Sequence, residues 1–233
     1  MALQAVIFDL DGVLTDTAEF HFIAWQSIAQ NLGVDFNLDD NEKLKGVDRH
    51  NSLQHILSKG NLTIDEQAFN QLLDRKNKHY LSLIASITPQ HLFEGVLACF
   101  TSLKARGIKI GLASASKNAT LVLNKLGIES LFDFVGDAAS VKNSKPAPDI
   151  FLSVAAGLGV DAHDCMGIED AAAGVTAIKS AKMYAVGIGD KNTLCQADQI
   201  FTTFDQLNLH LSDCLTAFES SQHSKVESPQ VDG

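Results

Sequence analysis

Cysteine is scarce in this chain of 233 residues, and long apolar runs are absent. The four cysteines lie far apart and form no C-x-x-C pair, which predicts reduced, mostly buried thiols in a cytoplasmic protein. No apolar stretch approaches the roughly 18 residues of a membrane span, so we expect no membrane contact. Strand-forming residues begin as early as Ala5, so we expect no signal peptide.

Basic residues are also in the minority, because 18 lysines and arginines face 28 aspartates and glutamates, for a net charge of −10. Proteins that bind nucleic acids usually carry a basic stripe, so this charge argues against a nucleic-acid partner. The pattern G-x-x-x-x-G-K-S/T is missing, which disfavours P-loop chemistry. The chain does have the length and, with 45% hydrophobic residues, the composition for a well-buried core domain and a smaller second domain.

Strand and helix patterns alternate after residue 88. This alternation implies parallel strands joined by right-handed helical crossovers, and hence an α/β fold with a parallel sheet flanked by helices. We expect strands at 108–113, 132–136, 165–168, 183–188 and 199–201, and helices at 92–105, at 118–126, from Pro146, and up to about Ala181.

Residues 17–87 lack a strand pattern and show helical patterns at 18–32, 49–58 and 64–84. An all-helical stretch between the first strand and the remaining α/β units is typical of a separate small domain. We therefore expect a discontinuous core of residues 1–16 and 88–218 with a helical cap of residues 17–87. The last residues, 219–233, are rich in Ser, Gln, His and Pro without an apolar period, which predicts a disordered tail.

Two acids, Asp9 and Asp11, follow the first strand-forming run and are themselves followed by Gly12. The carboxyl ends of buried strands are where open α/β sheets bind ligands. Two close carboxylates repel each other and resist desolvation, so they require a cation, a shared proton or a reaction. One can act as nucleophile or metal ligand and the other as general acid/base. The plainer alternative is that they only cap a turn.

A second acidic pair, Glu169 and Asp170, follows the strand predicted at 165–168. If the strands are parallel, all four acids meet at one edge of the sheet. Unit charges about 4 Å apart repel by about 4 kcal/mol at an effective dielectric constant of 20. Asp170 would regain only about 0.3–1 kcal/mol as the N-cap of the following helix. A divalent cation resolves the conflict, and ligands made only of oxygen favour Mg²⁺.

Two further loops suggest anion binding. Ser114–Asn118 follows a strand and opens a helix, where free backbone N–H groups form an anion cradle, although an ordinary serine N-cap is the alternative. Lys145 precedes Pro146, which restricts it to an extended backbone near a helix start, although a solvated surface lysine is the usual case.

The helical insert contributes two cations. Arg49 follows Asp48, a candidate N-cap, and therefore lies in the first turn of its helix. Lys76 lies on an apolar helix face, where a lysine usually reaches solvent from the edge, but with Arg49 it would bind an anion far from the metal. His21 and Trp25 share a helix face at i, i+4. Core packing is the default for both, and Trp25 is also a candidate for lining a sugar site.

The motifs Asp9-Leu-Asp-Gly-Val13, Ser114, Lys145 and Glu169-Asp170 resemble, in order, the four signature motifs of the haloacid dehalogenase superfamily. The helical insert is similar to the small cap domain of that superfamily. The segments Leu44–Arg49, Arg75–Asn77, 113–118 and 144–151 resemble those of its hexose-phosphate mutases. The resemblance covers about residues 1–215 and implies a Rossmann-like core with an all-helical cap.

The resemblance also implies an activity and a role for each motif. The protein would interconvert β-D-glucose 1-phosphate and D-glucose 6-phosphate through an aspartyl phosphate and a 1,6-bisphosphate. Asp9 would be the nucleophile, Asp11 the general acid/base, and Ser114 and Lys145 would hold the transferring phosphoryl group. Mg²⁺ would bind Asp9, the backbone carbonyl of Asp11 and Asp170, with Glu169 in or beside its shell. The substrate would contact Trp25, Lys45, Gly46, Arg49, Lys76, Ser114, Ala115, Ser116, Lys117, Asn118 and Lys145.

The same residues are also compatible with two other functions. A phosphatase for a small sugar phosphate would use the same core, but it has less need of paired cations in the cap. A non-enzymatic sensor of a phosphorylated ligand would not need the intact set of acids and lysine. In the enzymatic cases the partner is a small-molecule sugar phosphate, and we expect a monomer.

Overall fold

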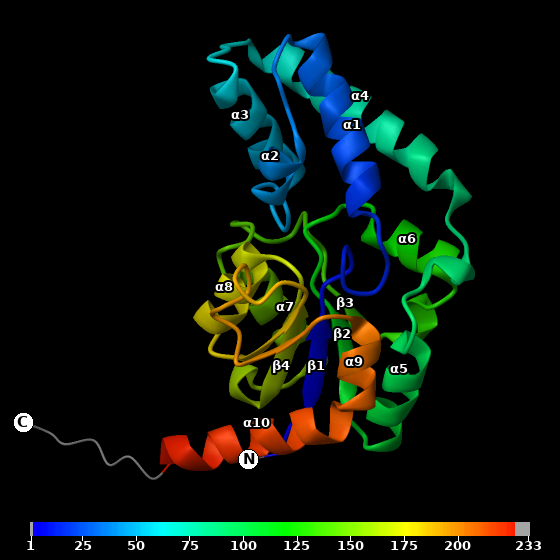
Figure 1. The fold of residues 1–233 in the computed structure, drawn as a ribbon, viewed down its shortest axis with the longest axis vertical. Helices are drawn as coiled ribbons and strands as arrows, with labels where there is room; N and C mark the ends of the chain where they lie inside the picture. The colour runs from blue at the N-terminus through cyan, green and yellow to red at the C-terminus, as the bar shows by residue number, and fades with distance from the viewer. Residues whose placement is uncertain (1, 227–233) are drawn as a thin grey trace, which may run out of the picture.

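The computed structural model describes residues 2–226, with side chains up to residue 222. Its centre is a six-stranded, wholly parallel sheet in the order β3-β2-β1-β4-β5-β6 (Figure 1). The strands are β1 (Ala5–Phe8), β2 (Lys109–Leu112), β3 (Phe134–Val135), β4 (Cys165–Glu169), β5 (Tyr184–Ile188) and β6 (Gln199–Phe201). The expected parallel α/β sheet is therefore confirmed, with β1 beside β4 at its centre.

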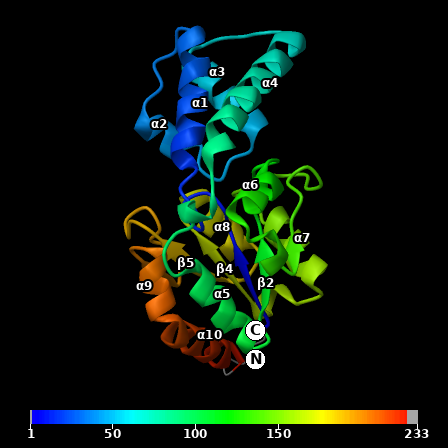
Figure 2. The same ribbon diagram turned by 90° about the vertical axis from the view of Figure 1, so that its right-hand side faces the viewer.

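Helices cover both faces of this sheet because successive side chains of a strand point to opposite sides. Val6 and Phe8 of β1 pack into a core beneath α5, α6, α9 and α10, whereas Ala5 and Ile7 pack against α7 and α8 (Figures 1 and 2). These helices are α5 (Val96–Ala105), α6 (Ala119–Leu126), α7 (Asp149–Leu158), α8 (Ala172–Ser180), α9 (Phe204–Leu209) and α10 (Leu211–Val226). Short 3-10 turns lie at Ile84–Ser86, Pro89–His91, Glu129–Leu131 and Ala162–Asp164.

The inserted segment forms a helical cap above the carboxyl edge of the sheet (Figure 1). Its helices are α1 (Ala18–Asn31), α2 (Leu38–Glu42), α3 (Arg49–Lys59) and α4 (Glu66–Leu83). The cap has its own apolar core, which includes Trp25, Ile28, Phe36 and Leu53. The short helix α2 was not expected, and it begins with a reciprocal capping box between Asn37 and Asp40.

Three sequence expectations are wrong in detail. The helix predicted from 92 begins at Val96, because Gly95 is left-handed (φ 86°) and Phe93 N instead donates to Leu14 O at 3.0 Å. Pro146 does not open a helix, since α7 begins at Asp149 and Ala147 N closes a turn onto Ser144 O at 3.0 Å.

The third correction concerns the tail, which was expected to be disordered from residue 219. Helix α10 continues to Val226 because Phe218 is buried against the sheet and Gln222 Nε2 donates to His163 O at 3.0 Å. The remaining residues of that expectation, 227–233, lie outside the described part of the chain. Within residues 2–226, every helix is too short or too polar to span a bilayer.

Candidate active site

The site begins where the chain order in the sheet reverses, between β1 and β4. In open α/β sheets ligands bind outside the carboxyl ends of the strands at such a switch point. Phe8 pairs with Ile168 in register, so Asp9 and the Glu169–Asp170 pair leave the two strands side by side. The predicted meeting of the two acidic motifs therefore follows directly from the strand order.

Three carboxylates form a compact cluster at this point. Asp9, Glu169 and Asp170 each offer an oxygen within 4.8 Å of the other two. Burial, together with the charge of Asp9, raises the pKa of Glu169, although Lys145 opposes the shift. Burial and the neighbouring charges of Glu169 and Asp9 raise the pKa of Asp170 well above its usual value. The raised pKa values indicate that the surrounding protein does not fully stabilise the negative charge of this cluster.

Lys145 lies beneath the cluster and compensates part of its charge. Its Nζ donates to Asp9 Oδ1 at 2.6 Å, to Glu169 Oε1 at 2.5 Å and to Ala113 O at 2.8 Å, so all three N–H groups are used. Burial opposes the charged form, but Asp9 and Glu169 outweigh it and raise the pKa of Lys145. This lysine is 2% exposed, so it is not a solvated surface lysine.

Two glycines leave room for the cluster. A Cβ on Gly12, whose φ is 81°, would lie 2.2 Å from Asp170 Oδ2, and a Cβ on Gly174 would lie 1.9 Å from the Glu169 carboxyl group. The backbone is therefore shaped around these two carboxylates. Hard oxygen donors, raised pKa values and this close cradle fit a divalent metal ion.

Asp11 stands apart from the three clustered carboxylates. It accepts a hydrogen bond from the hydroxyl of Thr17, and its Oδ2 lies 3.9 Å from His21 Nε2. Burial and then the charge of Asp9 raise the pKa of Asp11 to about 7. A carboxyl group with that pKa exchanges protons readily near neutral pH, as general acid/base catalysis requires.

His21 and Lys76 approach Asp11 from the cap. Lys76 Nζ lies 2.9 Å from His21 Nδ1 and 4.8 Å from the ring centroids of both Trp25 and Tyr80. Burial, with a contribution from Arg49, lowers the pKa of Lys76 to about 7. Because Lys76 is only 2% exposed, it does not reach solvent from the edge of its helix face.

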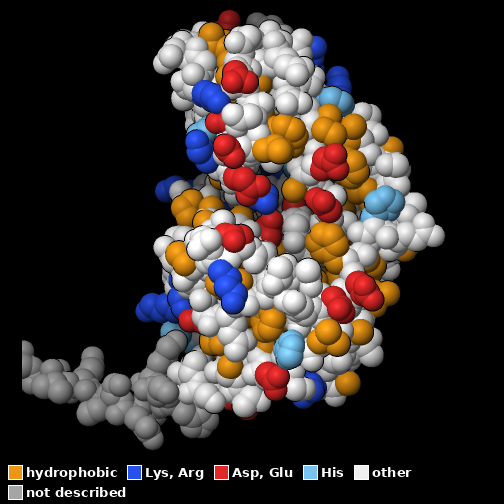
Figure 3. Space-filling view, viewed as in Figure 1, with side chains coloured by type: hydrophobic (Ala, Val, Ile, Leu, Met, Phe, Trp, Pro, Cys, Tyr) orange, Lys and Arg blue, Asp and Glu red, His pale blue; other side chains and the backbone are white. Residues whose placement is uncertain are grey.

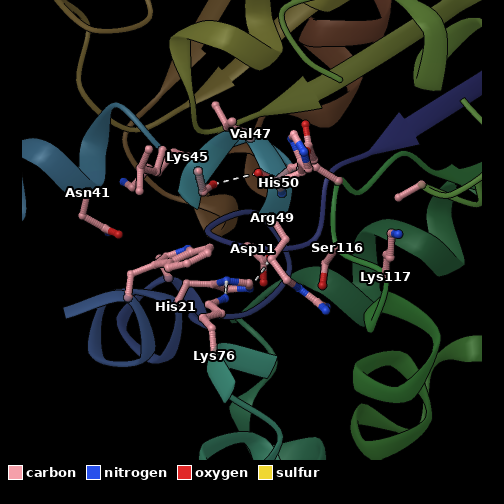
Figure 4. Close-up of a pocket in the computed structure, with 18 of the residues that line it drawn as sticks. Asp11, His21, Asn41, Lys45, Val47, Arg49, His50, Lys76, Ser116 and Lys117 are labelled. Atoms are coloured by element: carbon pink, nitrogen blue, oxygen red, sulfur yellow. Dashed lines mark hydrogen bonds and ion pairs between the residues drawn. The ribbon is translucent and has the colours of Figure 1, made fainter. Parts of the chain in front are cut away.

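A cavity of about 240 Å³ lies between cap and core, and Figure 4 shows its lining. The side chains of Arg49 and Ser116 approach the same part of it from the cap and from the core, respectively (Figure 4). The site residues predicted from sequence that line this cavity are Asp9, Asp11, Trp25, Lys45, Gly46, Arg49, Lys76, Ala115, Ser116, Lys117 and Asp170. Four predicted residues, Ser114, Asn118, Lys145 and Glu169, are not in the lining.

The loop from Ser114 to Asn118 is held by its own side chains. Ser114 Oγ accepts from Ser116 N at 3.1 Å, and Ser116 Oγ accepts from Asn118 N at 3.2 Å. Asn118 Nδ2 donates to Asn77 Oδ1 of the cap at 2.9 Å, which links the loop to helix α4. Both serines therefore stabilise turns within the loop. The alternative of a serine N-cap is wrong, because the N-cap of α6 is Asn118.

The cap segment before α3 closes over the core. Asp48 caps α3 by accepting from His50 N at 2.8 Å and Asn51 N at 3.1 Å, as the sequence indicated. Gly46 is left-handed (φ 73°), and a Cβ there would lie 3.4 Å from Lys145 Cδ. This segment therefore packs directly on the buried lysine.

Several lining residues were not singled out from the sequence. They include Asn41, His50, Ser52 and Ala138, and also His21, which was expected only to pack in the core. The position of His21 could have been predicted, because it precedes Trp25, a candidate lining residue, by one helical turn. The positions of the others could not, since their exposure to the cavity depends on how the cap meets the core.

The match to known families agrees with this geometry. Residues 3–182 match the family model described as haloacid dehalogenase-like hydrolase, and the chain belongs to this family. The chain is 45% identical to the beta-phosphoglucomutase of Bacillus subtilis over 90% of its length and 93% of that protein. The crystal structure of a beta-phosphoglucomutase from Clostridium difficile matches with a TM-score of 0.91 at 43% identity, covering 95% of this chain and 99% of that one.

A phosphatase is also among the relatives. The phosphorylated carbohydrates phosphatase of Thermotoga maritima is 29% identical over 85% of this chain and 93% of that protein. A relative that matches most of this chain is thus named for hydrolysis, so the choice between transfer and hydrolysis depends on the cavity.

Proposed function

We propose that this protein interconverts β-D-glucose 1-phosphate and D-glucose 6-phosphate, the activity of a β-phosphoglucomutase. One observation carries the proposal: the cavity between cap and core has an acidic end at Asp9, whose cluster offers oxygen ligands for a metal, and a cationic region formed by Arg49, Lys76 and Lys117. A mutase must bind a bisphosphate in two orientations, and therefore needs an anion site away from the reacting phosphate. The high identity to two beta-phosphoglucomutases supports the same conclusion.

Asp9 would act as the nucleophile. With Asp9 phosphorylated, the C6 hydroxyl of β-glucose 1-phosphate attacks the phosphorus atom, and the bond from phosphorus to the Asp9 oxygen breaks. Asp11 accepts the hydroxyl proton, which its pKa of about 7 permits. The resulting 1,6-bisphosphate turns around, Asp9 takes the phosphoryl group from C1, and Asp11 returns the proton to the C1 oxygen. This sequence regenerates phospho-Asp9 and releases glucose 6-phosphate.

The other residues position and neutralise these groups. Lys145, already 2.6 Å from Asp9 Oδ1, would hold an oxygen of the transferring phosphoryl group together with Ser114. Arg49, with Lys117 and Ser116, would hold the distant phosphate. Phosphoryl transfer is catalysed mainly by such positioning and charge neutralisation. Closure of the cap over the core would keep water away from phospho-Asp9, which disfavours hydrolysis.

The metal would be Mg²⁺, bound by Asp9, Asp170 and the backbone carbonyl of Asp11. Glu169 already accepts hydrogen bonds from Lys145 Nζ, Asp170 N and Ala171 N, so we place it beside the metal rather than as a principal ligand. The ion would supply charge neutralisation at the transferring phosphoryl oxygens. Oxygen-only donors favour Mg²⁺ over softer metals. One chain supplies all of these residues, and we infer that the monomer is the active unit.

The alternative is a Mg²⁺-dependent phosphatase for a small sugar phosphate. A product assay separates the two functions. The protein is incubated with β-glucose 1-phosphate, Mg²⁺ and a trace of glucose 1,6-bisphosphate, and products are followed by ³¹P NMR. Conversion to glucose 6-phosphate with little inorganic phosphate supports the mutase. Release of inorganic phosphate without glucose 6-phosphate would establish the phosphatase instead.

A further inference from the structure

Lys45 places a second ammonium group against the acidic cluster. Its Nζ lies 3.5 Å from Asp170 Oδ2 and 3.0 Å from Glu42 Oε1. Within residues 2–226, Lys145 forms ion pairs with Asp9 and Glu169 but not with Asp170. Each carboxylate of the cluster therefore faces one lysine, and Asp170 depends on Lys45.

The two lysines differ in how firmly they are held. Lys145 belongs to the core, its side chain is fully buried, and its three hydrogen bonds fix it in place. Lys45 belongs to the cap, its side chain is 25% exposed, and its longer contact with Asp170 is partly open to solvent. An ammonium on a flexible four-carbon stem that is already partly hydrated can leave its partner at low cost.

Lys45 and Asp170 also line two cavities that differ in charge, one mixed and one acidic. The cavity between cap and core is lined by acids and cations alike: Asp9, Asp11, Asp48 and Asp170 on one side of the balance, and Lys45, Arg49, Lys76 and Lys117 on the other. A second cavity, of about 610 Å³, shares Lys45 and Asp170 with it, and Lys45 is the one lysine or arginine among its lining residues. The acids lining this second cavity are Asp16, Glu42, Glu94, Asp170, Asp190 and Asp205. Acidic side chains are visible on both sides of the junction between cap and core in Figure 3.

The difference in charge between the two cavities favours a different ligand for each. A cavity lined by acids raises the local concentration of cations, and one lined by lysines and arginines does so for anions. A sugar phosphate would enter on the side of Arg49. A divalent cation would approach from the acidic cavity, where the first member of the cluster that it meets is Asp170, paired with Lys45.

We propose that Lys45 is an exchangeable counter-ion of the metal site: it neutralises Asp170 in the metal-free protein and gives up this carboxylate to a divalent cation that enters through the acidic cavity. The proposal deepens the proposed function and rests on it only for the presence of a metal ion. Lys45 then weakens metal binding by competition, and metal entry displaces a residue of the cap.

The test is metal affinity in the absence of substrate, with Mn²⁺ as the probe and the free ion measured by EPR. Lys45→Met removes the competitor, so we expect Mn²⁺ to bind roughly tenfold more tightly, the scale on which groups beside metal ligands alter affinity. Lys45→Arg keeps the charge and should bind no more tightly than the wild type. Thermal unfolding of each variant verifies that it is folded.

Lys43→Met is the matched control. Lys43 lies two residues away on the same cap segment, and its substitution by Met changes the net charge by the same amount. Its Nζ lies 3.9 Å from Asp40 Oδ1 and makes no ion pair with Asp170 within the described residues. We expect its Mn²⁺ affinity to equal that of the wild type. Unchanged affinity in Lys45→Met, or equal tightening in both variants, would overturn the proposal. Failure of the mutase assay would leave this result intact, so the two conclusions are tested separately.

The entry route has its own measurement. The double variant Glu94→Gln, Asp205→Asn removes two acids of the second cavity without touching the cluster, and stopped-flow mixing with Mn²⁺ should show association slowed roughly twofold or more. The control pair Asp39→Asn, Glu66→Gln, in the first turns of α2 and α4, should associate at the wild-type rate. Equal rates in all three proteins would exclude entry through the acidic cavity.

Discussion

The side-chain nitrogen of Lys145 lies 2.6 Å from Oδ1 of Asp9, although 136 residues separate the two in the chain. Asp9 is the proposed nucleophile and sits in a cluster with Glu169 and Asp170. A carboxylate crowded in this way carries a desolvation cost that a fully buried cation offsets. The same ammonium therefore has a structural role in the free protein, and in the proposed mechanism it also has a catalytic role beside the phosphoryl group.

Removing this ammonium should destabilise the fold as well as abolish phosphoryl transfer. Lys145→Met leaves Asp9 and Glu169 buried and close together without their shared cation. Breaking a buried ion pair by removing one partner costs about 3–5 kcal/mol. We expect a loss of this size in the free energy of unfolding, measured by urea denaturation at pH 7 without metal.

An exposed lysine three residues earlier supplies the control. Lys142→Met should unfold at the same urea concentration as the wild type. If Lys145→Met proves equally stable, the ion pairs at Asp9 and Glu169 contribute nothing measurable to the fold, and Lys145 is not the cation that offsets the burial of these carboxylates.

Gly12 should be intolerant of even one added carbon atom. In Gly12→Ala the new Cβ would lie 2.2 Å from Asp170 Oδ2, so Asp170 must move away from the cluster. The positive φ of 81° adds backbone strain of about 1–2 kcal/mol. We expect weaker binding of Mg²⁺, measured by isothermal titration calorimetry, and a lower melting temperature.

Gly107→Ala separates the two effects. Gly107 has a similar φ of 72°, but a Cβ there would meet no atom within 4 Å. This variant should lose stability through strain alone and bind Mg²⁺ as the wild type does. Normal Mg²⁺ affinity in Gly12→Ala would show that Asp170 is not confined by the glycine.

The stability of the protein should depend on pH through Lys76. Burial lowers its pKa from 10.5 to about 7, so between these values the folded state binds fewer protons at this site than the unfolded state. The contribution of Lys76 to the free energy of unfolding is therefore present above about pH 10.5 and is lost as the pH falls towards 7. Lys76→Met should be more stable than the wild type at about pH 7, by a margin that shrinks as the pH rises through about 8 and 9.

Urea denaturation at the three pH values measures this margin. Lys78→Met changes an exposed lysine of the same helix and should keep a constant difference from the wild type. Parallel pH profiles for Lys76→Met and the wild type would mean that Lys76 titrates normally in the folded protein.

Arg49 should matter for the bisphosphate and not for the metal. Arg49→Ala removes the cap cation that approaches Ser116, so we expect the KM for glucose 1,6-bisphosphate to rise by roughly tenfold or more, as loss of a charge-assisted contact predicts. Mg²⁺ affinity should stay the same. Arg75→Ala, which changes an exposed cap arginine bonded to Asn31, should leave both values unaltered. If Arg49→Ala has the same KM as the wild type, Arg49 does not bind the distal phosphate.

The acidic end of the site was predictable because it depends on strand order alone. Parallel strands end at one edge of a sheet, so any fold that pairs β1 with β4 brings Asp9 close to Asp170. The position of Lys145 was different. Its local pattern indicated only a rigid backbone, and the resemblance to a known superfamily supplied its role, because contact with Asp9 requires the loop before α7 to fold over the sheet.

The contacts between cap and core could not be predicted from the sequence pattern. The ion pair of Lys45 with Asp170 and the hydrogen bond between Asn77 and Asn118 depend on how two separately packed units meet. The end of α10 was mistaken for a disordered tail for a related reason. The polar composition of this segment predicts disorder. The hydrogen bond from Gln222 to His163 O is a tertiary contact, which hydrophobic periodicity does not predict.

The most direct test of the proposed mechanism is to look for the phosphoryl group on Asp9. The protein is mixed with glucose 1,6-bisphosphate and Mg²⁺, quenched in acid within milliseconds, and reduced with borohydride, which converts an acyl phosphate to an alcohol. Peptide mass spectrometry should then find homoserine at position 9, and Asp9→Asn should show no such product. Turnover to glucose 6-phosphate with Asp9 never modified would contradict the mechanism.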